Sequence, residues 1–375
     1  MNQNPKKTYS ERLQTGGPAF FITLTAALLT VCILLPILIS GAMKPSPKLE
    51  PTDNGTVTDS GDTQPQEPQF VPVFAPTAVA VKPYSTASTA QATIDSQFGV
   101  LMDAESGEIL AQKGSSVPFS PASMTKVMTL IVACENLSEA DLSRKIPFSE
   151  EIHAYVTSGQ YRGTELGLPV TSGGITCIGD RYFIKDLLYG VGIQSAADCT
   201  YMIVREICDT EADFVALMNQ KAKALGLTQT VFDNAVGFDS QGNLTTAEDM
   251  AVIMAYAMES PLIADILKPR TQRYGIKSHY TDDYGAEKTY DVWFECSFIS
   301  RHEKYPSFKL NTVELDATKT GYTNESFIVC HATSVSTGKR YILVLGNQTS
   351  VHNTITAKFK ATMMDIETIY NQYVS

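Results

Sequence analysis

Ser123 and Lys126 stand three positions apart at the start of an apolar stretch that covers residues 121–136. Ser120 followed by Pro121 is typical of a helix N-cap and of the first helical residue, so the pattern predicts a helix over this range. Residues three apart lie on the same face of a helix. Burial and the positive end of the helix dipole both lower the pKa of a lysine in such a place. A neutral amine beside a serine hydroxyl is a general base beside a nucleophile, although a Ser-x-x-Lys spacing is common and by itself is also compatible with no catalytic role.

Lys319-Thr320-Gly321 is a second group of residues suited to chemistry. It occurs once in the chain and lies just before a strand-like run. The lysine provides a cation for a substrate carboxylate, the threonine a hydroxyl, and the glycine lets another backbone come close. Taken alone, this tripeptide is also compatible with a polar turn. A further Ser-x-x-Lys spacing, at Ser336 and Lys339, falls in a predicted turn and indicates no such chemistry.

Charge and composition exclude several classes of protein. Asp and Glu number 40 against 29 Lys and Arg, which gives a net charge of −11. Nucleic-acid binding needs clustered positive charge, so we expect no nucleic-acid partner. The seven cysteines form no Cys-x-x-Cys pair and the chain has no His-Glu-x-x-His motif, so we expect no metal and no cofactor. No disulfide is predicted either.

The elements that must position these residues begin near residue 95. Alternating apolar runs predict two hairpins, one over residues 98–102 and 108–112 and one over residues 327–333 and 340–346. Between them the apolar periodicity predicts helices over residues 121–136, 184–191, 197–207, 211–225 and 247–258. Thr245 and Glu248 form a capping-box pattern before the last of these helices. Strands at both ends with helices between them favour one α+β domain, with an antiparallel sheet covered by helices.

The first quarter of the chain has a different character. Residues 19–43 carry no charge, and a helix of this length spans about 37 Å, enough for a bilayer core of about 30 Å. We expect a transmembrane signal anchor with residues 1–18 in the cytoplasm; a cleavable signal peptide is the alternative, because small residues near its end suit cleavage. Residues 44–94 hold eight of the 18 prolines, which predicts a disordered linker. The catalytic domain is then predicted over residues 95–375, on the extracellular face of the cell membrane.

The two motifs together, in this order, resemble the Ser-x-x-Lys and Lys-Thr-Gly set of penicillin-binding proteins and serine β-lactamases. The sequence is most similar to low-molecular-weight penicillin-binding proteins, the serine D-alanyl-D-alanine carboxypeptidases. The resemblance lies within residues 95–346 and is carried by residues 121–126, 187–195, 225–228, 232–239 and 246–250. It implies a β-lactamase/transpeptidase-like fold, a peptidoglycan stem peptide ending in D-Ala-D-Ala as substrate, and β-lactam antibiotics as inhibitors.

The resemblance also implies a role for each motif residue. Ser123 would attack the carbonyl of the penultimate D-Ala with Lys126 as its base, and water would then hydrolyse the acyl-enzyme. The backbone N–H groups of Ser123 and Tyr322 would stabilise the oxyanion. Lys319 and Thr320, followed by Gly321, would bind the terminal carboxylate.

The middle motif departs from the pattern of this family. The family has Ser-x-Asn, whereas this chain has Ser195-Ala196-Ala197 followed by Asp198. Ser195 can still relay a proton between the two lysines and the leaving amine. Asp198 is interpreted as a helix-start residue rather than a substitute for the amide. Losing one positioning hydrogen bond typically costs about 1.5–3 kcal/mol, on the order of 10- to 100-fold in rate.

We therefore expect an active carboxypeptidase, and two alternatives stay open. A weak or inactive penicillin-recognising domain that binds the cell wall would result if the missing amide is essential. A serine β-lactamase fits less well, because the deacylating glutamate of class A enzymes has no visible counterpart. Endopeptidase and weak transpeptidase activities also stay open, since they differ only in groove shape and acceptor. Residues 268–311 match the family poorly, and their aromatic side chains either line a groove for glycan or stem peptide or pack in the core or in a hairpin, the second being favoured.

Overall fold

The computed structural model describes residues 70–74, 90–157, 165–172, 175–238, 240, 242–302, 305, 307–348 and 354–374. All of them belong to one compact unit, Glu67–Ser375. The predicted cytoplasmic segment, residues 1–18, and the predicted anchor, residues 19–43, lie outside the described residues. Among the residues described, no single helix is both long and apolar enough to cross a bilayer.

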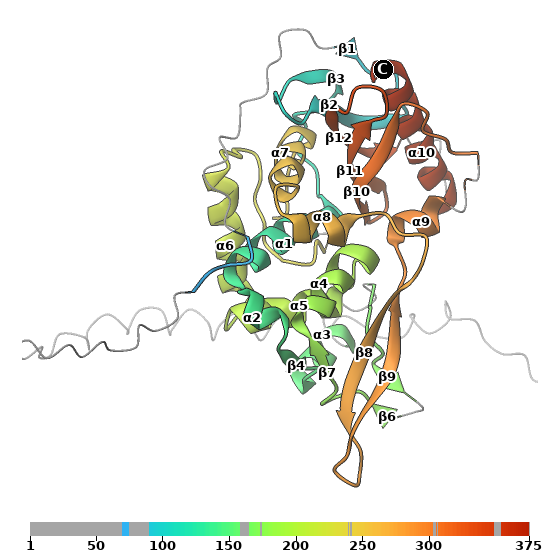
Figure 1. The fold of residues 1–375 in the computed structure, drawn as a ribbon. Coiled ribbons are helices and arrows are strands. Elements are labelled where there is room, and N and C mark those ends of the chain that lie inside the picture. Colours follow the sequence, from blue (N-terminus) through green and yellow to red (C-terminus); the bar gives the residue numbers. More distant parts are fainter. Residues whose placement is uncertain are drawn as a thin grey trace, which may run out of the picture. The chain divides into compact units, whose positions relative to one another are not determined.

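A six-stranded sheet joins the two ends of the domain (Figure 1). Its strands, in spatial order, are β1 (Ala90–Gln91), β3 (Ile109–Lys113), β2 (Ser96–Asp103), β12 (Arg340–Gln348), β11 (Ser326–Ser334) and β10 (Val313–Tyr322). Every neighbouring pair is antiparallel except β1 and β3, which are parallel. Both predicted hairpins are confirmed, as β2 with β3 and β11 with β12. The pairing of β12 with β2 makes one antiparallel sheet from the N-terminal and C-terminal strands.

Helices cover both faces of this sheet. Eight of the nine residues of β11 are buried, which requires packing on both sides of the strand. Helix α7 (Ala247–Ala257) lies on one side of the sheet and helix α10 (Ile355–Tyr373) on the other (Figure 1). The carboxylate of Asp365 in α10 accepts hydrogen bonds from the backbone N–H groups of Asp95, at 2.9 Å, and Ser96, at 2.7 Å. These bonds fix α10 against the start of β2.

Most of the remaining helices pack beside the sheet around α1, and the last two contact β10 (Figure 1). They are η2 (Ala122–Met124), α1 (Thr125–Asn136), α2 (Glu139–Leu142), α3 (Glu150–Thr157), α4 (Ile184–Tyr189), the π-helical turn η3 (Gly190–Gln194), α5 (Ala197–Ile207), α6 (Glu211–Ala224), α8 (Pro261–Leu267) and α9 (Ser297–His302). Ten of the 12 residues of α1 are buried, as its apolar sequence predicts. The predicted helix over residues 197–207 agrees with α5 to the residue, and the other predicted helices are confirmed apart from their ends.

The poorly matching segment, residues 268–311, contains a long hairpin. Strands β8 (Tyr274–Thr281) and β9 (Glu287–Phe294) project from the body of the domain and join β4 (Lys145–Pro147) and β7 (Arg181–Phe183) in a four-stranded sheet, while β5 (Thr171–Ser172) pairs with β6 (Ile175–Thr176) (Figure 1). Phe294 is buried and Tyr274 stacks on Tyr189 with ring centroids 4.3 Å apart. Packing therefore accounts for these two aromatic side chains. Tyr284, near the hairpin turn, is 95% exposed.

Two predicted helix starts are wrong in detail. The helix does not begin with Ser120 as N-cap, because residues 122–124 form a 3₁₀ turn that is preceded by Pro121 and has no side-chain cap. The start of α7 is capped by Thr246, whose hydroxyl accepts from the N–H of Asp249, and not by Thr245. Glu248 instead accepts a hydrogen bond from the hydroxyl of Ser115 at 2.6 Å. The start of α7 therefore keeps a local cap one residue later than predicted, and Glu248 contacts a distant part of the chain instead of closing a capping box.

Parts of the predicted linker, residues 44–94, lie against the domain. The N–H of Val73 donates to the carbonyl of Leu137 at 2.7 Å, and the N–H of Phe74 donates to that of Cys134 at 3.0 Å. Phe74 is buried, and β1 pairs with β3 from residue 90 onward. The predicted domain start at residue 95 is therefore too late. The other residues of the predicted linker lie outside the described residues.

Candidate active site

The structure brings Ser123 and Lys126 together at the start of the buried helix. Ser123 lies in the 3₁₀ turn η2 and is partly exposed, whereas Lys126 lies in the first turn of α1 and is 2% exposed. The Nζ of Lys126 is 3.2 Å from the Oγ of Ser123. The predicted pair of nucleophile and base therefore has hydrogen-bonding geometry, with the hydroxyl on the accessible side.

Two glycines let distant backbone segments pack on the turn that carries Ser123. A Cβ at Gly237 would lie 1.9 Å from the carbonyl oxygen of Ala122, and a Cβ at Gly321 would lie 2.9 Å from that of Pro121. Ala122 itself has φ of +49°, a conformation that is uncommon outside glycine and costs on the order of 1–3 kcal/mol. Tertiary packing therefore imposes the conformation of this turn, which explains why the local sequence predicted a regular helix start instead.

Lys126 is held in an environment that favours its neutral form. Its Nζ donates to the backbone carbonyl of Val236 at 2.5 Å. Burial lowers the pKa of Lys126 to about 7, and the carboxylates of Glu165 and Asp198 oppose this by favouring the charged form. A base whose pKa lies near neutrality is suited to accept the proton of the serine hydroxyl.

A second pair, Lys319 and Ser195, is also buried. The Nζ of Lys319, in β10, donates to the Oγ of Ser195 at 2.8 Å and to the carbonyl of Thr320 at 3.0 Å. Ser195 follows the π-helical turn η3 and has φ of +67°. π-Helical turns are frequent at functional sites, and here the turn directs Ser195 toward β10. The structure thus connects two of the predicted site residues that lie 124 positions apart.

The rest of the Lys-Thr-Gly motif lies along the same strand. The hydroxyl of Thr320 is 2.9 Å from that of Ser297, and either oxygen can be the donor. Gly321 packs beside the turn of Ser123, as described above. Tyr322 ends β10 and is half-exposed. Strand β10 therefore contacts Ser195 through Lys319 and the turn that carries Ser123 through Gly321.

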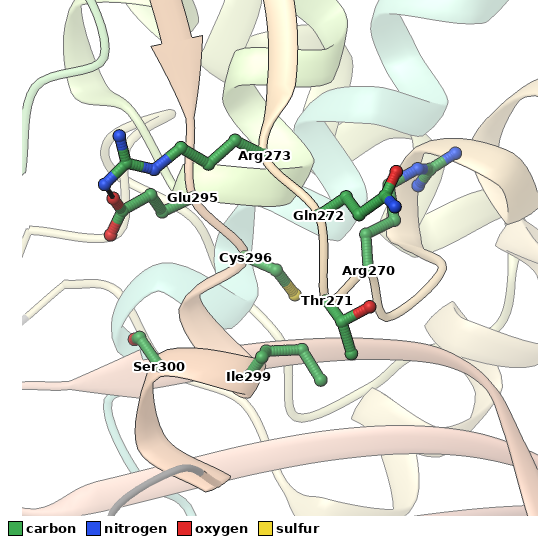
Figure 2. A pocket seen from close by; sticks show the side chains of 8 residues that line it. All are labelled: Arg270, Thr271, Gln272, Arg273, Glu295, Cys296, Ile299 and Ser300. Atoms are coloured by element: carbon green, nitrogen blue, oxygen red, sulfur yellow. Dashed lines mark ion pairs between the residues drawn. The ribbon is translucent and has the colours of Figure 1, made fainter.

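A pocket of about 260 Å³ lies at the base of the projecting hairpin (Figure 2). It is lined by Arg270, Thr271, Gln272, Arg273, Glu295, Cys296, Ile299 and Ser300. Arg273 and Glu295 form an ion pair across one side of it, at 2.5 Å, and the N–H of Glu295 donates to the side chain of Gln194 at 3.1 Å. Residues 295–300, which form one wall of the pocket, therefore contact two parts of the candidate site. Glu295 contacts Gln194, the residue before Ser195, and Ser297 contacts the hydroxyl of Thr320.

The departure from the family motif is a change from an amide to an apolar contact. Ala197 is buried and packs in a small cluster with Val236, against the partly buried rings of Tyr155 and Phe238. Asp198 is a helix-start residue, as expected. Its buried carboxylate accepts hydrogen bonds from backbone N–H groups, including that of Leu168 at 2.7 Å.

Sequence reasoning did not assign roles to three of these neighbours of the site. Val236 contributes a backbone carbonyl, which every residue type has, so its identity carries no signal. Glu165 acts through its charge on Lys126, and its place depends on the fold. Ser297 lies in the segment that matched the family poorly. Within the described residues, no group of His, Cys, Asp and Glu side chains is arranged to bind a metal, and all six cysteines there are free.

Comparisons with known proteins give a consistent result. Residues 85–350 match the family model described as D-alanyl-D-alanine carboxypeptidase. The D-alanyl-D-alanine carboxypeptidase DacF of Bacillus subtilis is 28% identical over 72% of this chain and 62% of its own length. DacC of Escherichia coli, with the same description, is 35% identical over 49% of this chain and 44% of its own length. The chain therefore spans less than two thirds of the length of these relatives.

The fold is shared with a solved structure. The crystal structure of a Streptomyces DD-transpeptidase has a TM-score of 0.60 and 25% sequence identity, covering 75% of this chain and 98% of that one. The match of the family model covers most of the chain and includes both lysine motifs. Together with the paired serines and lysines of the site, this shows that the chain belongs to the D-alanyl-D-alanine carboxypeptidase family.

Proposed function

We propose that this protein is a serine-type carboxypeptidase that removes the terminal D-Ala from peptidoglycan stem peptides and is acylated by β-lactams. The observation that carries the proposal is the contact between Ser123 and Lys126. The amine is buried, has a pKa lowered to about 7 and lies 3.2 Å from a partly exposed hydroxyl. The names of the relatives support the choice of substrate.

The geometry suggests how the reaction proceeds. The Oγ of Ser123 attacks the carbonyl carbon of the penultimate D-Ala while its proton passes to the Nζ of Lys126. Backbone N–H groups of Ser123 and Tyr322 stabilise the oxyanion. The C–N bond then breaks, and the proton held by Lys126 is relayed through the hydroxyl of Ser195, which is hydrogen-bonded to Lys319, to the leaving amine of the terminal D-Ala, so that Lys126 is neutral again. Water hydrolyses the resulting ester and regenerates the serine.

Labelling with a fluorescent penicillin tests the nucleophile. We expect Ser123→Ala to abolish covalent labelling, because the acyl group has no oxygen to bind. The second Ser-x-x-Lys spacing, at Ser336 and Lys339 in the turn between β11 and β12, supplies a matched control. Ser336→Ala should label like the wild type. Labelling that persists in Ser123→Ala, or that is lost in Ser336→Ala, would overturn the assignment.

Release of D-Ala from a pentapeptide that ends in D-Ala-D-Ala tests turnover. The proposal predicts release by the wild type and none by Ser123→Ala. Labelling by penicillin without release of D-Ala would favour the wall-binding alternative. Multiple turnovers of penicillin with no release of D-Ala would favour a β-lactamase.

We also propose that residues 19–43 anchor the protein in the cell membrane with the catalytic domain outside. The uncharged length of this segment supports the proposal. The full chain should remain in the membrane fraction after alkaline extraction, and a variant that lacks residues 1–43 should not. Protease added to intact cells should digest the catalytic domain. A full chain found in the soluble fraction, or one protected from protease, would contradict this proposal.

A further inference from the structure

The base of the proposed reaction requires an acceptor that fixes its orientation. A neutral lysine amine has two N–H groups and one lone pair, and only the lone pair can accept the proton of Ser123. The side chain of Ala197, at the position where an amide is expected, is a methyl group and makes no hydrogen bond. It lies instead in an apolar cluster with Val236. The orientation of Lys126 must therefore come from another group.

The backbone carbonyl of Val236 is that group. It accepts from the Nζ of Lys126 at 2.5 Å, while the Oγ of Ser123 lies 3.2 Å from the same nitrogen. Donation of one N–H to a fixed carbonyl restricts rotation of the amine about its last bond. The lone pair can then remain directed at the serine hydroxyl.

The side chain of Asn234 closes the turn that presents this carbonyl. Asn234 is 3% exposed. Its Oδ1 accepts from the N–H groups of Gly237, at 2.7 Å, and Phe238, at 2.9 Å, and its Nδ2 donates to the carbonyl of Phe238 at 3.0 Å. One buried amide thus bridges both sides of Val236.

Neighbouring helices fix the same turn in place. The hydroxyl of Thr129, in α1, donates to the carbonyl of Ala235 at 2.7 Å, and the carboxylate of Glu211, in α6, accepts from the N–H of Ala235 at 3.0 Å. Gly237 has φ of +74° and packs against the carbonyl of Ala122, next to the nucleophile. The turn is therefore built against the helix that carries the base.

We propose that Asn234 is a positioning residue for the general base. It holds the carbonyl of Val236 against Lys126 and so performs the orienting role that Ala197 cannot. The inference rests on the proposed function, because it concerns the base of that reaction. In the family motif the amide that orients the lysine is expected at residue 197. Here the buried amide of Asn234, from a different part of the chain, has this role.

The second-order rate of acylation by penicillin, measured as a function of pH, tests this role. Asn234→Ala should reduce the rate at pH 7 by about 10- to 100-fold, the effect of losing one positioning hydrogen bond. It should also move the rising part of the pH profile upward by one unit or more. Burial is the main cause of the lowered pKa of Lys126. Because a loosened turn admits water, that effect weakens and the pKa of Lys126 rises. The carboxylates of Glu165 and Asp198 act in the same direction, since they favour the charged amine.

Asn219→Ala is the matched control. Asn219 is also an asparagine that fixes this loop, through two hydrogen bonds of 2.8 Å to the backbone of Phe232, but it does not contact the turn around Val236. It should leave both the rate and the pH profile near those of the wild type. If Asn234→Ala does not fold, Asn234→Ser replaces it, because a serine hydroxyl closes such turns more weakly. The acylation rate of Asn234→Ser should then be lower than that of Asn219→Ala but greater than zero. Its pH profile should again be shifted to higher pH.

The outcomes separate this inference from the function on which it rests. A wild type that penicillin does not acylate overturns both. The positioning role alone is overturned if the wild type is acylated through Ser123 and the Asn234 variants have the same rate and pH profile as Asn219→Ala. A lower rate with an unchanged pH profile would indicate a general loss of stability and would also overturn it.

Discussion

At the scale of single residues, burial determines which chemistry the site can perform. Lys126 and Lys319 are both buried and each lies within hydrogen-bonding distance of a serine hydroxyl. Ser123 is the partly exposed member of the four, which leaves it accessible to a substrate. The arrangement separates Ser123 and Lys126, the proposed nucleophile and base, from Ser195 and Lys319, the pair proposed to relay a proton and bind a carboxylate.

The pH dependence of acylation follows from the lowered pKa of Lys126. Below this pKa the amine is protonated and cannot accept the proton of Ser123; above it the amine is neutral and active. With a pKa of about 7, the acylation rate should rise by about tenfold between pH 6 and pH 8 and then level off. Stopped-flow or quenched-labelling kinetics with penicillin would measure it. A rate that is flat from pH 6 to pH 9, or that keeps rising toward pH 10, would show that the amine is not the base.

Residue types and spacing predicted Ser123, Lys126 and Lys319, and the family resemblance predicted Ser195, but neither predicted the contacts that tune them. Ser-x-x-Lys and Lys-Thr-Gly are local patterns, so they can be found without a structure. Ala122 has its positive φ in a turn on which Gly237 packs. The carbonyl that contacts Lys126 belongs to Val236, which lies more than 100 positions away in the sequence. Such contacts arise from tertiary packing and leave no local pattern.

At the scale of elements, the site is assembled where α1, η3 and β10 meet. The two hairpins of the main sheet and helix α5 were predicted because their apolar residues alternate or recur with clear periodicity. The strands β8 and β9 were not predicted as elements, since their exposed residues alternate weakly; only two interpretations of their aromatic side chains were given. The two-residue strand β1 is too short to produce a pattern.

Asp198 links helix α5 to the segment before it. Its buried carboxylate accepts from the N–H groups of Gly167, Leu168 and Cys199, at 2.9, 2.7 and 2.8 Å. Asp198→Ala leaves these donors without an acceptor and should lower the free energy of unfolding by about 3 kcal/mol. Asp209→Ala, at an exposed position after α5, should change it by less than about 0.5 kcal/mol. Denaturant unfolding measures both, and equal stabilities would refute the anchoring role.

At the scale of the whole unit, segments distant in sequence close the structure. Strand β12 pairs with β2, and residues 70–74 lie along the end of α1. The linker prediction failed for these residues because their proline- and threonine-rich surroundings are typical of disordered chains, whereas one buried aromatic side chain and two backbone hydrogen bonds hold them. A pattern of five residues is too short to reveal such a contact.

Phe74 is the side chain that attaches this segment. It is 5% exposed and its ring meets that of Tyr256 edge-on, with centroids 5.2 Å apart. Phe74→Ala should destabilise the domain by about 3 kcal/mol. Phe70→Ala, in the same segment but 58% exposed, should have little effect on the thermal midpoint. A domain whose stability is the same in both variants would show that the segment does not contribute to the fold.

The central claim is that Ser123 is the nucleophile, and its most direct test is to locate the covalent adduct. Protein treated with benzylpenicillin at pH 8 would be analysed by intact mass and by fragmentation of its peptides. The account predicts one penicilloyl group per chain, attached to Ser123, and no adduct in Ser123→Ala. An adduct on any other residue, or no adduct on the wild type, would contradict it.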